Sequence, residues 1–372
     1  MTIEFWRDRK VLITGHTGFK GSWLCLWLHW RGAKVHGYSL PPPTEPSLYE
    51  QAAVGEVVES VTGDIRDQSK IAAEIERIKP NVIMHLAARS VVFDAYADPV
   101  EAYSTNVVGT ASVLNGVRRL KSKCAVINVT TDKVYENRGW IWGYREDDTL
   151  GGRDPYSSSK ACAELVANAF HQSYFSNTEQ AHQIGLASAR AGNVVGGGDW
   201  TPHQLIPDSV AAFARGQPVV LRNPDATRPW QHVLDCLSGY LTLAEALYGD
   251  PMKFSGGWNF GPADEDSRPV SRVVELLAVP WGVQSPWVRD TVAHPHEAVE
   301  LRLNSQKAKS LLGWQGRLPL ATTLAWTSDW FRRYATGEAV RNLCFSQIDD
   351  YTAVKVEASE TERRGPTCLP RT

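Results

Sequence analysis

Short apolar runs alternate with helical stretches along the first half of the chain. The runs are rich in β-forming residues, and turn residues or amphipathic segments separate them. Regular alternation of strand and helix predicts a parallel sheet with helices on both faces, so we expect an α/β fold. The predicted strands begin near residues 11, 33, 57, 81, 125 and 185, and the predicted helices cover 22–29, 68–79, 101–119 and a segment from 154.

The first strand leads directly into three glycines, Gly15, Gly18 and Gly21. A strand, a glycine turn and a helix place backbone N–H groups and a helix N-terminus under a pyrophosphate. We expect Gly15 to form the turn, Gly18 to let phosphate approach the backbone, and Gly21 to let the helix pack closely. The predicted cofactor-binding residues of this turn are Gly15, Thr17, Gly18, Phe19, Lys20 and Gly21.

The second strand ends without the acidic residue that usually accepts from the ribose 2′-OH of NAD. The chain has Tyr38 and Ser39 there, and it offers no arginine for a 2′-phosphate either. This strand therefore does not distinguish NAD from NADP.

Later strand ends supply further candidate cofactor contacts. Asp64 can accept from an adenine amino group and Ile65 can cover the ring, although an ordinary turn aspartate explains Asp64 equally well. The small residues Ala87 and Ala88 let a nicotinamide pass close to the sheet. The expected contacts are Asp64, Ile65, Leu86, Ala87, Ala88, Asn106 and Thr130, together with Tyr156 and Lys160.

Two groups of polar residues carry candidate chemistry. Thr131, Asp132 and Lys133 follow the fifth strand, where ligands bind in parallel sheets, although a solvated turn is the plain alternative. Tyr156 and Lys160 are four residues apart and share one helix face. An ammonium beside a phenol favours the phenolate, so we expect Lys160 to lower the pKa of Tyr156 towards that of a useful base. Lys160 can also donate to the nicotinamide ribose.

From residue 201 onwards prolines interrupt shorter elements. We expect residues 1–200 to form a Rossmann-type NAD(P)-binding domain, to which later segments can return. Residues 201–335 are expected to form a smaller mixed α/β lobe for the substrate, and 336–372 a partly flexible C-terminal extension.

The net charge is −2 and charged residues make up 22% of the chain, which gives no footprint for nucleic acid. No apolar run is long enough for a membrane span, and we expect no signal peptide. The six cysteines are scattered, which favours reduced thiols in a cytoplasmic protein. His294 and His296 have no matching ligands nearby, so we expect no metal site.

These features resemble the extended short-chain dehydrogenase/reductase family over roughly residues 8–335. Within it the chain is most similar to the nucleotide-sugar 4,6-dehydratases, in particular the branch that acts on CDP-glucose. The motifs that carry the resemblance are Thr14–Ser22, Thr130–Tyr135, Tyr156–Lys160, Arg190–Trp200 and Arg228–Val233.

The resemblance implies bound NAD and a sugar-nucleotide substrate, CDP-glucose, which loses water to give a 4-keto-6-deoxy sugar for deoxysugar and lipopolysaccharide precursors. It implies that Arg228 and Arg302 hold the diphosphate and that Asn193 and Asn259 help to position it. It also implies a homodimer or homotetramer, paired through the helix of Tyr156 and the helix at 101–119.

The resemblance further implies roles for the candidate catalytic residues. Tyr156 would take the C4 hydroxyl proton, Thr131 would orient that hydroxyl, and protonated Asp132 would donate to the leaving C6 hydroxyl. The related dTDP-glucose dehydratases have Glu, their C5 base, where this chain has Lys133. Lys133 is then either a neutral base or a cation that stabilises the enolate, and both roles stay open.

Three other functions remain open. A nucleotide-sugar 4-epimerase shares Tyr156 and Lys160 but needs no acid such as Asp132 near C6. A 4,6-dehydratase could act on another sugar nucleotide. A non-catalytic dinucleotide-sensing protein would gain nothing from the Tyr156–Lys160 pair.

Overall fold

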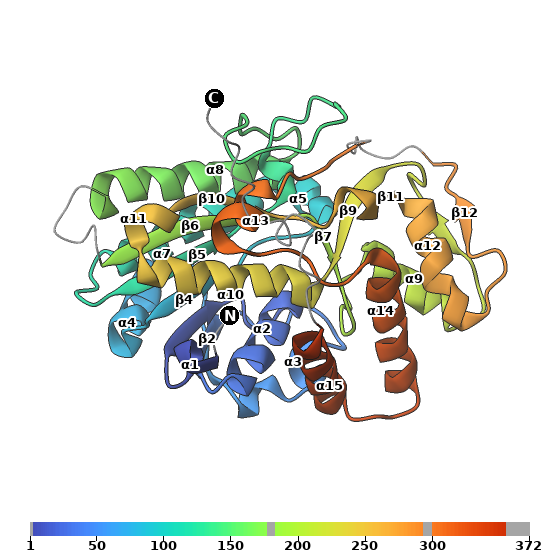
Figure 1. Cartoon of the computed structure of the whole chain (residues 1–372), viewed down its shortest axis with the longest axis horizontal. Coiled ribbons are helices and arrows are strands. Elements are labelled where there is room, and N and C mark those ends of the chain that lie inside the picture. The colour runs from blue at the N-terminus through green and yellow to red at the C-terminus, as the bar shows by residue number, and fades with distance from the viewer. Residues whose placement is uncertain (1–2, 177–182, 293–299, 355–372) are drawn as a thin grey trace, which may run out of the picture.

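A seven-stranded parallel sheet forms the centre of the molecule, with strand order β10-β6-β5-β4-β1-β2-β3 (Figure 1). The computed structural model describes residues 3–176, 183–292 and 300–354. The predicted α/β fold with a doubly wound parallel sheet is confirmed. The strands are β1 (Lys10–Thr14), β2 (Lys34–Ser39), β3 (Glu59–Thr62), β4 (Val82–His85), β5 (Cys124–Val129), β6 (Ile184–Ala191) and β10 (Gly256–Phe260).

The strand order reverses between β1 and β4. Lys10 of β1 pairs with Lys34 of β2 on one side, and Val11 pairs with Val82 of β4 on the other. Ligands of such sheets bind outside the carboxyl ends of the strands at this switch point. Both β4 and β5 are buried along their whole length, as strands covered on both faces must be.

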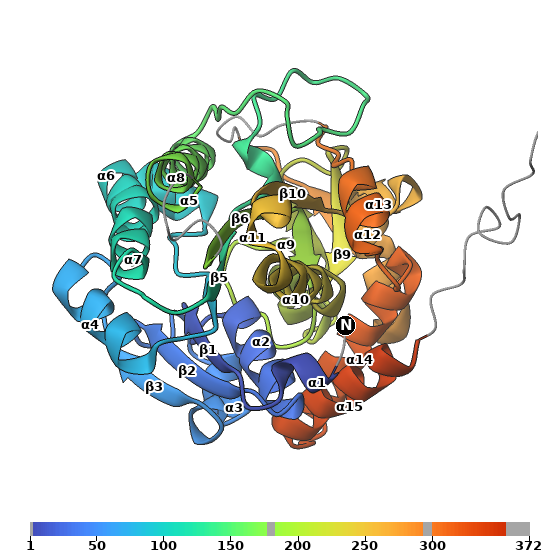
Figure 2. The ribbon, with the colours of Figure 1, turned by 60° about the vertical axis from the view of Figure 1, so that its left-hand side comes forward.

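Helices cover both faces of this sheet (Figure 2). On one face α2 and α10 contribute to the larger hydrophobic core, and on the other α4 and α7 contribute to a second core. The predicted helix at 101–119 is observed as three consecutive elements, α6, η2 and α7. The bounds are α2 (Phe19–Trp30), α4 (Gln68–Ile78), α6 (Pro99–Tyr103), η2 (Ser104–Val108), α7 (Gly109–Val117), α8 (Pro155–Phe170) and α10 (Val233–Gly249).

A smaller lobe lies on the right of Figure 1 and contains two short sheets. One has the order β11-β9-β7, and the other pairs β12 with β8. The chain leaves this lobe after β9, since α10 packs on β5 and β6 and β10 is an edge strand of the seven-stranded sheet. The elements of the lobe are β7 (Asn193–Val195), α9 (Leu205–Phe213), β8 (Val219–Leu221), β9 (Thr227–His232), β11 (Ser267–Pro269), α12 (Val270–Ala278), β12 (Trp287–Arg289) and α14 (Leu320–Ala335).

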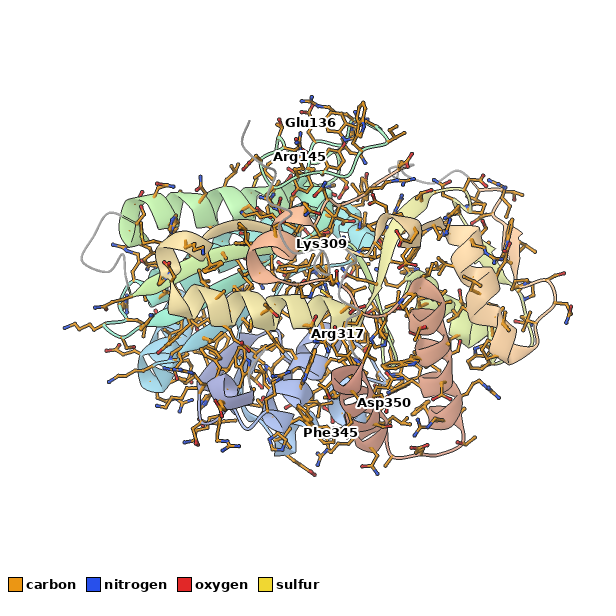
Figure 3. All side chains as sticks on the ribbon, in the orientation of Figure 1. Glu136, Arg145, Lys309, Arg317, Phe345 and Asp350 are labelled. Carbon is orange, nitrogen blue, oxygen red and sulfur yellow. The ribbon has the colours of Figure 1, made fainter. Side chains whose placement is uncertain are left out.

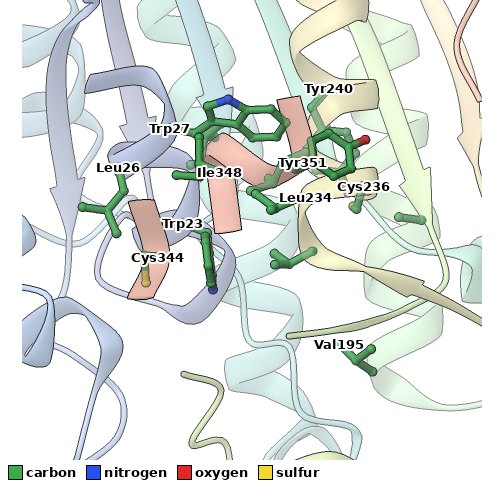
Figure 4. Packing of buried hydrophobic residues seen from close by; sticks show 14 of the residues in the cluster. Trp23, Leu26, Trp27, Val195, Leu234, Cys236, Tyr240, Cys344, Ile348 and Tyr351 are labelled. Carbon is green, nitrogen blue, oxygen red and sulfur yellow. The ribbon is translucent and has the colours of Figure 1, made fainter. Parts of the chain in front are cut away.

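The C-terminal region contains a helix that the sequence pattern did not predict, α15 (Val340–Ala353). It packs on α2, where the Tyr351 and Trp27 rings meet edge to face at 5.4 Å (Figure 4). Trp30 Nε1 also donates to Asp349 Oδ1 over 2.9 Å. The segment expected to be a loose tail, from residue 359, lies outside the described residues.

Short elements complete the described chain, and none of its helices is long and apolar enough to cross a membrane. The remaining bounds are α1 (Ile3–Trp6), α3 (Leu48–Gln51), η1 (Val54–Glu56), α5 (Val92–Ala97), η3 (Asp132–Val134), η4 (His171–Phe175), α11 (Pro251–Phe254), η5 (Asp264–Asp266), η6 (Val279–Trp281) and α13 (Gln306–Leu312).

Candidate active site

The glycine turn has the geometry expected from its spacing. Gly15 has φ of +75°, and a Cβ there would lie 2.7 Å from the Ala87 backbone nitrogen. A Cβ on Gly21 would overlap the Gly15 carbonyl oxygen, so the helix can approach the turn only with glycine there. Gly18 is the N-cap of α2, and no side chain caps this helix. The first N–H groups of α2, which include those of Phe19 and Lys20, are therefore suited to an anion.

Thr17 ties the glycine turn to the end of β2. Its Oγ1 lies 2.9 Å from Ser39 Oγ and donates to the Leu40 carbonyl over 3.0 Å. A hydroxyl pair thus occupies the strand end where the sequence lacks an acidic residue.

The expected adenine contacts already have partners within the chain. Asp64 accepts from Arg66 at both carboxylate oxygens, and these hydrogen bonds lower the pKa of Asp64. Ile65 is 4% exposed and packs in the core, and a Cβ on Gly109 would overlap its side chain. The structure therefore gives Asp64 and Ile65 local roles, and their contact with a cofactor stays a prediction.

The segment after β4 is held by hydrogen bonds from two directions. The Leu86 and Ala87 N–H groups donate to the carbonyl and hydroxyl oxygens of Thr14, over 3.1 and 3.3 Å. Ala88 follows, and Asn106 then binds the backbone of Arg89 through both side-chain atoms and donates to Ser159 Oγ over 2.8 Å. Asn106 is 1% exposed, so it positions this segment against α8.

Four candidate catalytic side chains form one connected chain of hydrogen bonds. Thr131 Oγ1 donates to Asp132 Oδ1 over 3.0 Å, and a hydrogen bond of Thr131 with the Tyr156 hydroxyl lowers the pKa of Tyr156. Lys133 Nζ lies 3.4 Å from Asp132 Oδ1. Asp132 is fully buried, and its Oδ2 has no hydrogen-bond partner among the described residues. This places a carboxyl oxygen free to bind a ligand two hydrogen bonds away from a phenol.

Tyr156 and Lys160 lie on the buried face of α8, but they do not interact as the sequence suggested. Asp154 caps this helix by accepting from the Ser157 N–H over 2.9 Å. Lys160 Nζ donates to the Val129 carbonyl over 2.8 Å, and burial, followed by the charge of Lys20, lowers the pKa of Lys160 to about 8.

The expectation that Lys160 lowers the pKa of Tyr156 is therefore corrected for the ligand-free chain. Burial raises the pKa of Tyr156, and nearby Asp132 and Asp154 raise it further. The group that lowers this pKa is Thr131, through its hydrogen bond.

The predicted substrate residues fall into two groups. Asn193 Oδ1 is buried without a hydrogen-bond partner among the described residues. The preceding Gly192 lies beside Asp132, since a Cβ there would come within 3.2 Å of Oδ2. Arg228 is buried on β9, and half-buried Arg302 donates to Glu300 over 2.8 Å.

Asn259 differs from the expectation that it touches the substrate. It is fully buried, its Oδ1 accepts from the Tyr135 hydroxyl, and its Nδ2 donates to the carbonyls of Tyr144 and Asn304. Because these bonds use both ends of the amide, Asn259 is a positioning residue.

Sequence reasoning missed a buried ion pair between Glu164 and Arg190, which lies next to Thr130. The available signal was helical spacing, because Glu164 is four residues after Lys160 and eight after Tyr156. Thr130, expected at the cofactor, donates to Glu164 Oε1 over 2.5 Å instead.

The loop between η3 and α8 lies at the top of Figure 3, where Glu136 and Arg145 mark it. Its Tyr144 pairs with Leu303, which brings the loop against the strand segment of Arg302. Within the described ranges no group of three or more His, Cys, Asp or Glu side chains could hold a metal ion, and His294 and His296 lie outside those ranges.

Comparison with known proteins decides the family. Residues 12–326 match the family described as GDP-mannose 4,6 dehydratase. The chain belongs to this family of extended short-chain dehydrogenase/reductases. It is 49% identical to a CDP-glucose 4,6-dehydratase of Salmonella typhimurium, over 94% of this chain and 97% of that protein.

Solved structures share the fold of this dehydratase family. The dTDP-glucose 4,6-dehydratase of Bacillus anthracis in complex with NAD superposes with a TM-score of 0.74 and 23% identity, over 90% of this chain and all of the other. A UDP-glucose 4-epimerase of Thermotoga maritima, solved with UDP-glucose, gives a TM-score of 0.75 and 20% identity, over 88% and 99% of the two chains. At these identities the likeness concerns the fold alone.

Proposed function

We propose that this chain is an NAD-dependent CDP-glucose 4,6-dehydratase, a lyase that forms CDP-4-keto-6-deoxyglucose and water for deoxysugar biosynthesis. The observation that carries the proposal is the connected group of Tyr156, Thr131 and Asp132, with one buried carboxyl oxygen left unpartnered. An acid beside the base is what water loss needs and epimerisation does not. The 49% identity to a CDP-glucose 4,6-dehydratase supports CDP as the nucleotide.

The residues of the glycine turn fit a dinucleotide. Gly15 and Gly21 keep the turn and helix in contact, and the uncapped start of α2 offers N–H groups to the pyrophosphate. Lys160 lies on the same helix face as Tyr156 and would donate to the nicotinamide ribose. When bound, NAD supplies the site that accepts hydride from C4 and returns it to C6.

Tyr156 takes the proton of the C4 hydroxyl in this proposal. In the ligand-free chain Thr131 Oγ1 donates to Asp132 Oδ1 over 3.0 Å, and a hydrogen bond between Thr131 and the Tyr156 hydroxyl lowers the pKa of Tyr156. A substrate hydroxyl that replaces this hydrogen bond would lie between Tyr156 and Thr131. Thr131 then fixes the angle at which the hydroxyl meets the base.

Asp132 and Lys133 together serve the second half of the reaction. Lys133 Nζ lies 3.4 Å from Asp132 Oδ1, so both groups can reach the same part of a bound sugar. In one alternative a neutral Lys133 amine takes the C5 proton while protonated Asp132 donates to the C6 hydroxyl. In the other, water takes the C5 proton, the Lys133 ammonium stabilises the enolate, and protonated Asp132 again donates to the C6 hydroxyl.

Arg228 and Arg302 hold the diphosphate in this proposal, and Asn193 positions the sugar. Asn193 follows Gly192, which lies beside Asp132, so a sugar bound by Asn193 is near the acid. Arg228 lies on β9 of the smaller lobe, and Arg302 lies in the segment that pairs with Tyr144.

We also propose that two copies pair through α6, η2 and α8. These neighbouring elements carry large apolar side chains on the surface: Val100 (76% exposed), Val108 (54%) and Leu165 (57%). Further association of two such pairs would give a tetramer. The free cysteines of the described chain support a reducing compartment, such as the cytoplasm.

The test is product analysis with CDP-glucose, dTDP-glucose and UDP-glucose side by side. We expect a product that has lost one water, formed fastest from CDP-glucose, with no net accumulation of reduced cofactor. A product of unchanged mass would instead identify an epimerase. No turnover of any sugar nucleotide would favour a dinucleotide-sensing protein.

A further inference from the structure

A buried ion pair joins the helix of Tyr156 to the centre of the sheet. Glu164 on α8 and Arg190 on β6 have side chains only 4% and 5% exposed. Arg190 Nε lies 2.8 and 2.9 Å from the two carboxylate oxygens, and Nη2 lies 2.5 Å from Oε2. Burying two charges costs about as much as their attraction returns, so such a pair contributes little net stability. Its value to the protein must lie in the position that it fixes.

The same ion pair binds both residues that flank the candidate acid–base segment. On one side Thr130 Oγ1 donates to Glu164 Oε1 over 2.5 Å. On the other side Arg190 Nη1 donates to the Tyr135 hydroxyl over 2.7 Å. Asp132 and Lys133 therefore lie between two anchors that converge on one ion pair, and Glu164 belongs to the helix that carries Tyr156.

Tyr135 continues the network towards the substrate side. Its hydroxyl donates to Asn259 Oδ1 over 2.7 Å, and Asn259 Nδ2 donates to the carbonyls of Tyr144 and Asn304. The Tyr144 N–H in turn donates to the carbonyl of Arg302 over 2.9 Å. These contacts thus link α8 to the backbone of Arg302, a residue that we propose to bind the diphosphate.

We propose that Tyr135, together with the Glu164–Arg190 ion pair, is a positioning group that sets the place of Asp132 and Lys133 relative to Tyr156. The proposal rests on the dehydratase function above. The C4 oxidation needs Tyr156 as base, with Thr131 only orienting the hydroxyl, whereas water loss needs both Asp132 and Lys133 from the anchored segment. Loosening the network therefore affects water loss more than oxidation. A displacement of about 1 Å can reduce a reaction rate on the order of 100-fold.

Tyr135→Phe tests the proposal, because it removes one hydroxyl and keeps the buried ring. Tyr144→Phe is the matched control. Its ring stacks on Tyr135 at 5.0 Å and is equally buried, but its hydroxyl binds Arg138 and Asn137 outside the network. The measurements are product formation from CDP-glucose, the reduced cofactor present during turnover, and amide hydrogen exchange of the cofactor-free protein.

For Tyr135→Phe we expect product formation to fall about tenfold or more, with reduced cofactor accumulating because oxidation outpaces water loss. Amide exchange should quicken within residues 131–135, and Tyr144→Phe should show neither change. A merely structural role would lower thermal stability and leave the reduced fraction unchanged, which would overturn the proposal.

Arg190→Lys provides a second variant if Tyr135→Phe does not fold. Lysine keeps the charge beside Glu164 but has one nitrogen in place of the Nε, Nη1 and Nη2 that Arg190 uses, so it cannot reproduce this fixed geometry and the same accumulation of reduced cofactor is expected. Wild-type protein that gives no dehydrated product would refute the proposed function. If the wild-type protein is a dehydratase and its folded variants accumulate no more reduced cofactor than it does, only the positioning role is refuted.

Discussion

At the residue scale, the environment of Tyr156 departs most from what the sequence suggests. Burial raises the pKa of Tyr156, and a hydrogen bond with Thr131 lowers it. Lys160 binds the Val129 carbonyl instead of the phenol. A lysine four residues from a tyrosine guarantees a shared helix face and does not guarantee contact, because the lysine side chain is long enough to find other acceptors. Ligand binding then has to create the conditions under which Tyr156 becomes a base.

The first residue-scale prediction separates the two halves of the reaction. Tyr156→Phe should reduce both reduced-cofactor formation and product formation by about 100-fold or more, because the C4 proton has no acceptor. Asp132→Asn should slow water loss about 100-fold while changing the first oxidation much less, because Tyr156 and Thr131 remain in place. Rapid mixing with CDP-glucose, followed by absorbance of the reduced cofactor, measures both steps. Equal loss of both steps in Asp132→Asn would remove Asp132 from its role as acid.

At the element scale, helix α15 supports the helix that follows the glycine turn. Besides the contact between Tyr351 and Trp27, which Figure 4 shows, the Tyr351 hydroxyl donates to Asp235 Oδ1 over 2.8 Å. Asp235 also accepts the backbone N–H groups of Arg317 and Leu318. One buried carboxyl group therefore joins α10, the segment before α14 and the C-terminal helix.

A pH-dependent stability follows from this carboxyl group. Burial raises the pKa of Asp235 to about 6, although its N–H and hydroxyl donors act against this. The pKa of Asp235 is higher in the folded state than in the unfolded chain, so proton binding to Asp235 stabilises the fold. This stabilisation is complete below about pH 4 and is lost as pH rises through about 6.

Relative to Asp235→Asn, the free energy of unfolding of the wild type should therefore fall between pH 4 and pH 7, by at most about 3 kcal/mol. Urea unfolding of both proteins across this range provides the measurement. In Tyr351→Phe the fall should move to higher pH, since a donor to the carboxylate is lost. A constant difference between wild type and Asp235→Asn across the range would contradict the assignment.

At the scale of the whole molecule, the helix that carries Tyr156 also borders an exposed apolar surface. Val108 on η2 and Leu165 on α8 are more than half exposed, and the two elements pack together. Exposed apolar side chains gathered on neighbouring helices mark association surfaces. If two copies pair here, the α8 helices that carry Tyr156 lie at the interface between the copies.

Leu165→Glu should therefore shift the protein towards monomers, because it places a charge in the proposed interface. Analytical ultracentrifugation of the two proteins at matched concentration measures this. Met252→Glu is the control, since Met252 is 49% exposed on α11, which is not part of the proposed surface. If Leu165→Glu leaves the oligomeric state of the wild type unchanged, the proposed pairing surface is wrong.

The sequence by itself determined the parts of this protein that are local in the chain. Strand–helix alternation predicted the doubly wound sheet, and the spacing of Gly15 and Gly21 predicted a turn that only glycine can form, because both features depend on neighbouring residues. The polar segment after β5 and the Tyr156 helix face were found for the same reason. The α15 helix was missed although Val340, Leu343, Ile348 and Tyr351 repeat at helical spacing, because the polar composition of the C-terminal region as a whole favoured a loose extension.

Only the tertiary structure decided which of these side chains meet. It connected Tyr156 to Asp132 through Thr131, turned Lys160 to a backbone carbonyl, and enclosed Asn259 in hydrogen bonds that no spacing indicates. It also brought Glu164 and Arg190 together at the centre of the sheet. Contacts between residues distant in the chain depend on how the layers pack, and burial then sets the protonation of each group.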